Sequence, residues 1–261
     1  MNIEGKVIII TGGMGGMGYE TAKALLKNGA KFIAIFDLPG SADEIDSSSK
    51  GLFATERAKF FPGDISIDFT LKSNFDRVVN DQGCVDIVIN NAGIVNEQNI
   101  QRLVDLNVKA VLSCSLLALT HMGKHKGGRG GLIVNVNAIL GLTDCPLLPF
   151  YSATKHAIIG FTRCMKDNFN STGVRVVSIC PGVTKTNLIR KLPENLCDFI
   201  SDTIKEKVLT EVPVQSPTSV ADAIVEIIKK GESGAVWVVE NDKKPYAIKP
   251  VDHYVNMSYP I

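Results

Sequence analysis

Runs of consecutive apolar residues alternate along the chain with longer segments in which apolar residues recur every three or four positions. Val-Ile-Ile-Ile at 7–10 and Ile-Val-Ile at 87–89 are typical of the runs. Unbroken apolar runs indicate parallel strands covered on both faces, and the longer spacing indicates helices. We expect strands over residues 6–11, 31–36, 58–62, 86–89, 132–136, 174–180 and 235–239. We expect helices over residues 16–28, 67–80, 99–125, 150–171, 195–209 and 218–230.

The regular alternation of strands and helices predicts the fold class. It indicates an α/β protein with a doubly wound, mostly parallel sheet of about seven strands and helices on both faces. Residues 41–50 are rich in Ser and Asp and indicate a loop or a poor helix. No internal repeat or linker interrupts the pattern, so we expect residues 1–261 to form a single domain with an irregular tail at 241–261.

The composition narrows the class of protein. Lys and Arg total 28 and Asp and Glu total 27, so no basic excess argues for nucleic acid as a partner. The start of the chain shows no signal-peptide pattern, and no apolar run approaches the roughly 20 residues that span a bilayer. The six cysteines are scattered without a Cys-x-x-Cys pair. We therefore expect a cytoplasmic protein with reduced thiols and no membrane span.

A glycine-rich motif, Thr-Gly-Gly-Met-Gly-Gly-Met-Gly, occupies residues 11–18 between the first expected strand and the first expected helix. In this context Gly12 permits a tight turn, Gly16 lets the backbone approach a pyrophosphate, and Gly18 lets helix and strand pack closely. The helix that follows offers free N–H groups and the positive end of its dipole to a phosphate. The motif, which includes Met17, therefore predicts a dinucleotide site.

Asp37 ends the second expected strand, about 20 residues after the glycine motif. A carboxylate at this place accepts hydrogen bonds from both adenosine ribose hydroxyls and repels a 2′-phosphate. Neither Leu38 nor the glycine loop brings a positive charge. These residues favour NAD over NADP as the cofactor; the alternative is that Asp37 only caps a loop.

Tyr151 and Lys155 lie four residues apart in Tyr-Ser-Ala-Thr-Lys, within an expected helix. Positions i and i+4 share a helix face, so the phenol and the ammonium point into one space. A tyrosine keeps its proton up to a pH of about 10, and we expect a fixed ammonium beside it to lower that pKa. Together with a dinucleotide site, the pair predicts nicotinamide-dependent alcohol/ketone chemistry.

In combination and order, these motifs resemble the short-chain dehydrogenase/reductase family over residues 5–240. The match also includes Asp64, Asn90-Asn91-Ala92-Gly93, Asn107 and Pro181-Gly182. The stretch that begins at Tyr151 is similar to 15-hydroxyprostaglandin dehydrogenases, and the end of the chain is similar to insect-type alcohol dehydrogenases. The resemblance implies a Rossmann-type fold.

The resemblance also implies roles for individual residues. Asp64 and Ile65 are expected beside adenine, Asn91 to Gly93 with Ala92 beside the cofactor ribose, and Val183 and Thr186 at the nicotinamide end. Asn107 is expected to kink the long helix and to hold a water that links Lys155 to solvent. The alternatives are that Asp64 caps the following helix and that Asn107 makes only a local hydrogen bond.

The chain departs from the family pattern at Ala138, where the family carries a serine that bonds the reacting oxygen. Losing one such preorganised donor lowers turnover by about 10²–10³-fold. Asn137, on a distorted strand end, and Thr143, beyond Gly141, are the two possible replacements for the missing hydroxyl. Two classes of function therefore stay open: a dehydrogenase weakened by the alanine, and a dehydrogenase-derived protein that binds NAD and a lipophilic ligand without efficient catalysis.

The residues around Tyr151 are apolar and predict the kind of substrate. A lipophilic secondary alcohol or its ketone suits such walls, and the long segment 183–216 is expected to close over it as a lid. The alternative is that these side chains serve packing alone. The expected substrate residues are Leu140, Leu148 and Phe150.

Two further features of the sequence concern a metal and a partner. His121 and His125 lie four residues apart but have no carboxylate or thiol at a suitable spacing, so they predict no metal site. The expected helices at 99–125 and 150–171 carry apolar positions that are compatible with a homodimer and equally compatible with covering the sheet.

Overall fold

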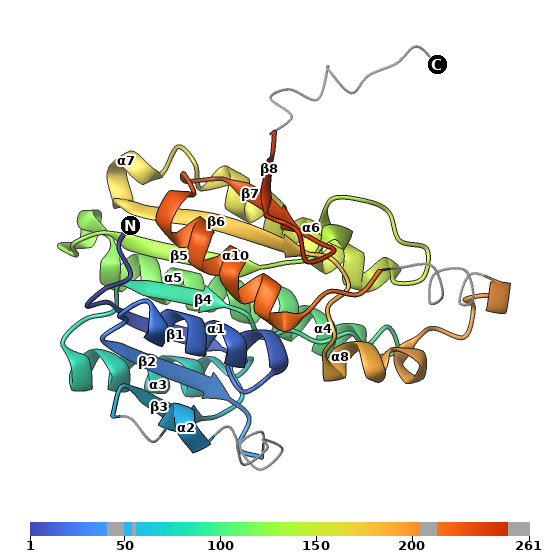
Figure 1. Cartoon of the computed structure of the whole chain (residues 1–261), viewed down its shortest axis with the longest axis horizontal. Coiled ribbons are helices and arrows are strands. Elements are labelled where there is room, and N and C mark those ends of the chain that lie inside the picture. Colours follow the sequence, from blue (N-terminus) through green and yellow to red (C-terminus); the bar gives the residue numbers. More distant parts are fainter. Residues whose placement is uncertain (41–49, 54–55, 204–212, 250–261) are drawn as a thin grey trace.

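The computed structural model describes residues 1–40, 50–53, 56–203 and 213–249. Its centre is one eight-stranded sheet in the order β3-β2-β1-β4-β5-β6-β7-β8 (Figure 1). The first seven strands are parallel, and β8 runs antiparallel to β7. The strands are β1 Val7–Thr11, β2 Phe32–Asp37, β3 Ala58–Pro62, β4 Ile87–Asn90, β5 Gly131–Val136, β6 Val174–Pro181, β7 Val236–Val239 and β8 Tyr246–Ile248.

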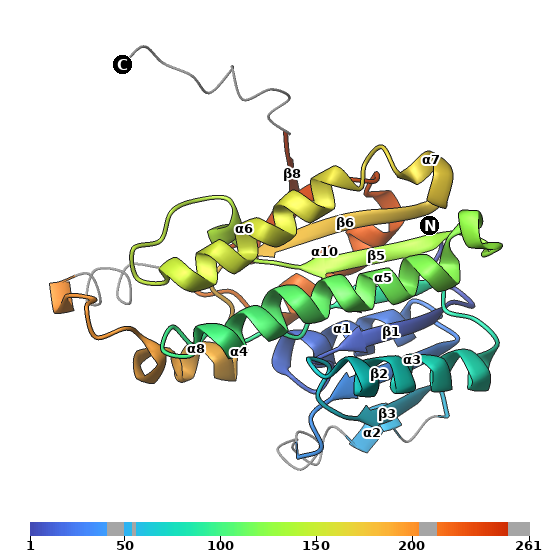
Figure 2. The ribbon, with the colours of Figure 1, turned by 180° about the vertical axis from the view of Figure 1, so that it is seen from behind.

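Helices cover both faces of this sheet. Helices α1 and α10 lie on the face seen in Figure 1, and α3, α5 and α6 lie on the face seen in Figure 2. The helical elements are α1 Gly16–Lys27, α2 Lys50–Phe53, α3 Asp68–Gln82, α4 Ile100–Val104, the π-helical turn η2 Asp105–Ala110, α5 Val111–Met122, η3 Lys124–Lys126, η4 Ile139–Gly141, α6 Pro149–Cys164, α7 Phe169–Thr172, α8 Asn187–Arg190, η5 Leu192–Asn195 and α10 Pro217–Lys230.

The apolar run of β1 shows why the strand sequences do not alternate with polar residues. Ile8 and Ile10 point into the core under α1 and α10, whereas Val7 and Ile9 point into the core under α3 and α5. All four side chains are completely buried. Both faces of the strand therefore need apolar side chains, and the predicted doubly wound, mostly parallel sheet is confirmed.

The sheet has one strand more than expected, because the region predicted to be irregular after residue 240 begins with a hairpin. Asn241 and Asp242 turn the chain with φ angles of 58° and 54°. Asn and Asp tolerate this left-handed conformation better than other non-glycine residues. The turn returns β8 along β7, where Tyr246 donates a hydrogen bond to Glu240 Oε1 at 2.7 Å. The rest of the tail, 250–261, lies outside the described residues.

Three expected helices differ in the structure. The helix at 99–125 contains the turn η2, and the helix at 150–171 ends at Cys164 before a separate short α7. The helix expected from 195 is wrong over 196–201, where the chain forms a turn with a hydrogen bond from Ile200 N to Cys197 O after the Pro193-containing η5. Three expected features fall outside the described residues: the continuation of this helix at 204–209, residues 41–49 of the expected loop or poor helix, and part of the expected lid.

Ile100–Met122 is the one run among the described residues that is long and apolar enough to cross a membrane. In the protein its buried residues, including Leu106, Cys114 and Ala118, join the core beside the sheet. Helix α5 packs there against β4 and β5. Packing against the sheet therefore accounts for the apolar character of this helix.

The strand order reverses between β1 and β4, since β2 and β3 lie on one side of β1 and β4 to β8 on the other. Ligands of doubly wound sheets bind in the crevice beyond the carboxyl ends of the strands at such a point. The glycine motif after β1 and the Asn-Asn-Ala-Gly segment after β4 meet there, because Thr11 and Asn90 are paired across the two strands.

Candidate active site

The glycine motif forms a tight turn whose geometry requires glycine at two positions. Gly12 has a φ of +63°, and a Cβ atom there would lie 2.7 Å from Ala92 Cα. A Cβ atom at Gly18 would collide with the Gly12 carbonyl and would lie 2.7 Å from the amide nitrogen of Asn91. Helix α1 begins at Gly16 without a side-chain cap. Its first N–H groups are therefore available to an anion.

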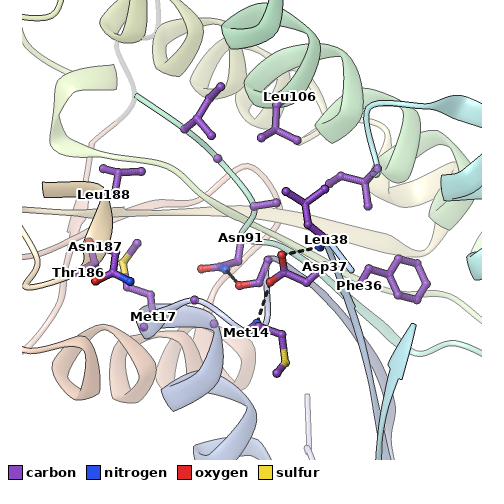
Figure 3. A pocket seen from close by; sticks show the side chains of 18 of the residues that line it. Met14, Met17, Phe36, Asp37, Leu38, Asn91, Leu106, Thr186, Asn187 and Leu188 are labelled. Carbon is purple, nitrogen blue, oxygen red and sulfur yellow. Dashed lines mark hydrogen bonds between the residues drawn. The ribbon is translucent and has the colours of Figure 1, made fainter. Parts of the chain in front are cut away.

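A cleft of about 350 Å³ opens at this turn and contains most of the residues predicted to bind the cofactor (Figure 3). Pro181, Gly182 and Val183 lie outside its lining, at and beyond the end of β6. Tyr151 and Lys155, also expected to contact the cofactor, lie outside the lining as well. The predicted residues that line it are Gly12, Gly16, Met17, Gly18, Asp37, Asp64, Ile65, Asn91, Ala92, Gly93 and Thr186.

Asp37 is fixed at the edge of the cleft by two backbone amides. Its Oδ2 atom accepts a hydrogen bond from Met14 N at 2.9 Å, and its Oδ1 atom accepts one from Leu38 N at 2.8 Å (Figure 3). The carboxylate therefore organises the loops, which is the alternative considered for Asp37, and it also lines the cleft, where the expected ribose contact stays a prediction. The neighbouring Leu38 side chain is exposed and uncharged.

Asn91 joins the two loops of the cleft. Its Nδ2 atom donates to Gly12 O at 2.8 Å, which holds the glycine turn against the segment after β4. Its Oδ1 atom is buried and lacks a hydrogen-bond partner among the described residues. A buried acceptor without a partner is costly, so this atom suits a ligand that brings a donor. The cleft therefore fits the polar ribose and phosphate groups of a dinucleotide.

Asp64 forms an ion pair with Arg102, a residue that belongs to none of the sequence motifs. Arg102 Nη2 lies 2.9 Å from Asp64 Oδ2, and the Ser66 backbone and hydroxyl donate to Asp64 Oδ1. Burial alone raises the pKa of this carboxyl, but the Ser66 hydrogen bonds and the Arg102 charge together hold it below its usual value. Arg102 also lines the cleft from α4. An isolated arginine in a helix carries no motif by which the sequence could identify it.

Tyr151 and Lys155 share the inward face of α6 and are both buried, with 9% and 6% of their surfaces exposed. Lys155 Nζ lies 5.3 Å from the centroid of the Tyr151 ring and donates to Val136 O at 3.4 Å. Burial raises the pKa of the Tyr151 hydroxyl and lowers the pKa of the Lys155 ammonium to about 8. The expected lowering of the Tyr151 pKa is therefore not found in this arrangement, where burial and, after it, the neighbouring Cys180 raise that pKa.

Asn107 lies in the π-helical turn η2 and reaches across to the segment after β4. It donates to Ile94 O and accepts from Ile94 N, both at 2.9 Å, and it donates to Thr154 on α6 at 3.3 Å. A Cβ atom at Gly93 would lie 3.3 Å from Asn107 Oδ1 and 3.6 Å from Lys155 Nζ. Gly93 therefore lets the backbone of the cleft approach both side chains. The hydrogen bonds of Asn107 thus join three segments of the chain and differ from the local bond within the helix that was the alternative.

Ala138 follows β5 and packs in the same apolar cluster as Tyr151. The two possible replacements for a hydroxyl are engaged or distant. The Asn137 amide nitrogen donates to Lys155 O at 3.0 Å and its oxygen accepts from Ala138 N at 2.9 Å, whereas Thr143 is exposed. Neither side chain offers a donor beside Tyr151 in this arrangement.

The predicted substrate residues lie around Tyr151. Leu148 is buried in the cluster, and Leu140 and Phe150 are partly buried against it. The cluster extends to the segment that follows β6 through Leu192, Leu196 and Ile200. His121, in contrast, packs against Phe75 away from this cluster, and no group of three metal-binding side chains occurs in the part of the chain that the structure describes.

The glycine turn before α1, the acid after β2 and the cleft where the strand order reverses define a Rossmann-type dinucleotide-binding protein. A sequence model of the short chain dehydrogenases matches residues 6–196. The chain therefore belongs to the short-chain dehydrogenase family, and the predicted family is confirmed.

Similar proteins agree with this assignment. The chain is 32% identical over 249 residues to the rat (Rattus norvegicus) 15-hydroxyprostaglandin dehydrogenase [NAD(+)], covering 93% of this chain and 94% of the relative. It is 33% identical over 241 residues to alcohol dehydrogenase 2 of Ceratitis cosyra, covering 91% and 92%. A short-chain type dehydrogenase/reductase from Mycobacterium marinum has the same fold, with a TM-score of 0.76, 22% identity and coverage of 92% and 95%.

Proposed function

We propose that the protein is an NAD-dependent oxidoreductase that interconverts a lipophilic secondary alcohol and its ketone. The observation that carries the proposal is the buried pair Tyr151 and Lys155, of which the Lys155 ammonium approaches the dinucleotide cleft at Gly93. The names of the similar proteins, which specify NAD(+) in one case and alcohol dehydrogenase in the other, support this reaction.

The cleft residues suit NAD from one end to the other. Asp64 and Ile65 would hold the adenine, Asp37 the adenosine ribose, and the first turn of α1 the pyrophosphate. Asn91, Ala92 and Gly93 would hold the second ribose, and Pro181, Gly182, Val183 and Thr186 would lie at the nicotinamide end. NAD supplies the hydride acceptor when bound.

The proton is handled by residues of α6. In the reductive direction the Tyr151 hydroxyl donates a proton to the carbonyl oxygen, and its raised pKa keeps it protonated at neutral pH for this step. In the oxidative direction Tyr151 must first lose its proton, and its phenolate then takes the proton of the alcohol. A charged Lys155 favours the phenolate and would hold the nicotinamide ribose, and a water held by Asn107, across Gly93 from Lys155, would carry the proton toward solvent.

The apolar cluster around Tyr151 supports a lipophilic substrate. In the described part of the 183–216 segment, Leu192 and Leu196 belong to this buried cluster, which supports a role of the segment as a lid. Closure of such a segment would exclude water from the transfer of hydride. The side chains that fill the cluster would then move aside for the substrate.

We also propose a homodimer formed through α4, α5 and α6. Ile100, Val104, Leu112 and Leu116 are exposed along one helical run, with Leu116 64% exposed. Contiguous exposed apolar side chains are typical of interfaces. Sedimentation of Leu116→Glu tests this pairing: a shift to monomer supports it, and an unchanged sedimentation rate contradicts it.

A cytoplasmic location stays a prediction, with which six free cysteines agree.

Ala138 supports a second candidate, a protein that binds NAD and a lipophilic ligand without efficient catalysis. The missing hydroxyl leaves the reacting oxygen with Tyr151 as its hydrogen-bond donor on this side. The test is NADH formation with a series of secondary alcohols of increasing chain length, alongside calorimetric titration with NAD. Turnover that rises with chain length supports the dehydrogenase. Tight NAD binding without turnover, also in Ala138→Ser, supports the binding protein.

A further inference from the structure

Glu97 is a buried carboxylate, 1% exposed, at the start of the helix that carries Tyr151. Its Oε1 atom accepts a hydrogen bond from Tyr151 N at 2.7 Å, and its Oε2 atom accepts one from Phe150 N at 3.0 Å. Glu97 therefore holds the backbone of the catalytic tyrosine itself, from a segment more than 50 residues earlier in the sequence.

Helix α6 needs this support because its own sequence supplies no cap. The first N–H groups of a helix have no partner within it, and a short polar side chain at the preceding position usually accepts from one of them. That position is Leu148, which is buried in the cluster around Tyr151 and makes no capping bond. A side chain of the apolar cluster thus occupies the capping position, and Glu97 accepts the hydrogen bonds of the first helical N–H groups instead. Its negative charge also suits the positive end of the helix dipole.

The same residue is hydrogen-bonded to the segment 194–197, which packs in the apolar cluster. Glu97 N donates to Asn195 O at 2.9 Å, and the Cys197 thiol donates to Glu97 O at 3.4 Å. The adjacent Gln98 side chain donates to Leu196 O at 2.9 Å. Leu196 in turn packs in the cluster that contains Tyr151. One short segment therefore connects the pocket cover to the first turn of α6 through both hydrogen bonds and packing.

Glu97 has an unusual environment for a residue that serves stability alone. No ion pair of the described residues includes it, so its charge is compensated by the two backbone N–H groups and the helix dipole. Burying a carboxylate without a cation is costly. Such a cost is tolerated where the group fixes a geometry that an apolar residue cannot fix.

We propose that Glu97 is a positioning residue: it sets the place of Tyr151 beside the cofactor cleft and couples that place to the segment 194–197 over the substrate pocket. This inference rests on the proposed function for its catalytic part. Glu97 does not touch the reacting atoms; it acts through the backbone of Tyr151. A displacement of 194–197 would reach the tyrosine through the Glu97 main chain and carboxylate.

The test compares Glu97→Gln and Glu97→Ala with the parent chain and with Val78→Ala, a buried control on α3 away from the site. Glutamine keeps the size but points an amide N–H at one of the helix N–H groups. We expect kcat to fall by about 10²-fold in Glu97→Ala and by less in Glu97→Gln, while the KM for NAD is unchanged. Val78→Ala is expected to lose stability without this fall in kcat. Equal kcat values in the parent and both Glu97 variants overturn the inference.

Hydrogen exchange provides a readout that does not depend on turnover. In Glu97→Gln we expect faster exchange in the peptides that cover 148–152 and 194–197 together, with α10 unchanged. Unchanged exchange at 194–197 overturns the coupling. Absence of turnover in the parent and in Ala138→Ser counts instead against the proposed function, and the exchange of the two segments then still decides whether Glu97 couples them.

Discussion

Lys155 places its Nζ atom 5.3 Å from the centroid of the Tyr151 ring, one helical turn further along α6. Both side chains are buried, and burial acts on their pKa values in opposite directions. The pKa values of two buried groups this close together change strongly when a charge or solvent reaches them.

Ala138→Ser is expected to increase turnover. Ala138 lies in the cluster with Tyr151, so a hydroxyl on its Cβ would add a donor for the reacting oxygen. One preorganised donor changes kcat by about 10²–10³-fold. NADH formation at saturating alcohol measures the effect, and calorimetric titration checks that NAD binding is unaltered. An unchanged kcat would indicate that the remaining residues are not arranged for this reaction.

Asp37→Asn is expected to weaken the preference for NAD. The carboxylate lines the cleft and is held by Met14 N and Leu38 N, and its charge disfavours a 2′-phosphate. Hydrogen bonds to charged groups contribute about 1.5–3 kcal/mol, so we expect kcat/KM for NAD to fall by about 10–100-fold. The ratio of NAD to NADP efficiencies measures the change. Asp81→Asn, on the exposed side of α3, is the control and should leave that ratio as it is.

Lys155 makes stability depend on pH. Its pKa falls from its ordinary value of 10.5 to about 8 in the folded protein, so between these pH values the unfolded chain binds more protons. The free energy of unfolding therefore rises with pH over this window, and the cost of burying the ammonium is fully present below pH 8. Lys155→Met removes this cost, which is about 3 kcal/mol for a shift of this size.

Urea unfolding of the parent and of Lys155→Met at pH 7 and at pH 10 checks that prediction. The variant is expected to be more stable at the lower pH, and the difference should shrink at the higher pH. A parent that is more stable than Lys155→Met at pH 7 would contradict the assignment of a desolvated ammonium at this position.

Much of the fold follows from the sequence because its signals are local. The run at Val7–Ile10 is apolar throughout, and the structure covers both faces of β1 as that pattern requires. Most of the cleft lining follows as well, since the glycine motif and Asp37 have fixed places relative to a strand and a helix. The hairpin to β8 had a local signal in Asn241-Asp242, but a three-residue strand is too short to form a recognisable pattern.

The rest of the site depends on contacts between distant segments. Glu97 and Arg102 carry no motif, and their roles appear once α6 and Asp64 are brought beside them. The shift of the Tyr151 pKa also depends on segments that are distant in the sequence. Spacing on a helix brings the ammonium near the phenol, but the degree of burial depends on the apolar cluster that the rest of the chain supplies.

Tyr151→Phe is the decisive test of Tyr151 as the group that exchanges a proton with the substrate. The substitution removes one hydroxyl and keeps the ring that packs in the cluster, and Tyr246→Phe, on the exposed edge strand, is its matched control. Single-turnover NADH formation and NAD affinity are measured on the parent and both variants. The account predicts a loss of about 10²–10⁴-fold in the rate for Tyr151→Phe alone, with unchanged NAD affinity. A Tyr151→Phe protein that forms NADH at the parent rate would contradict it.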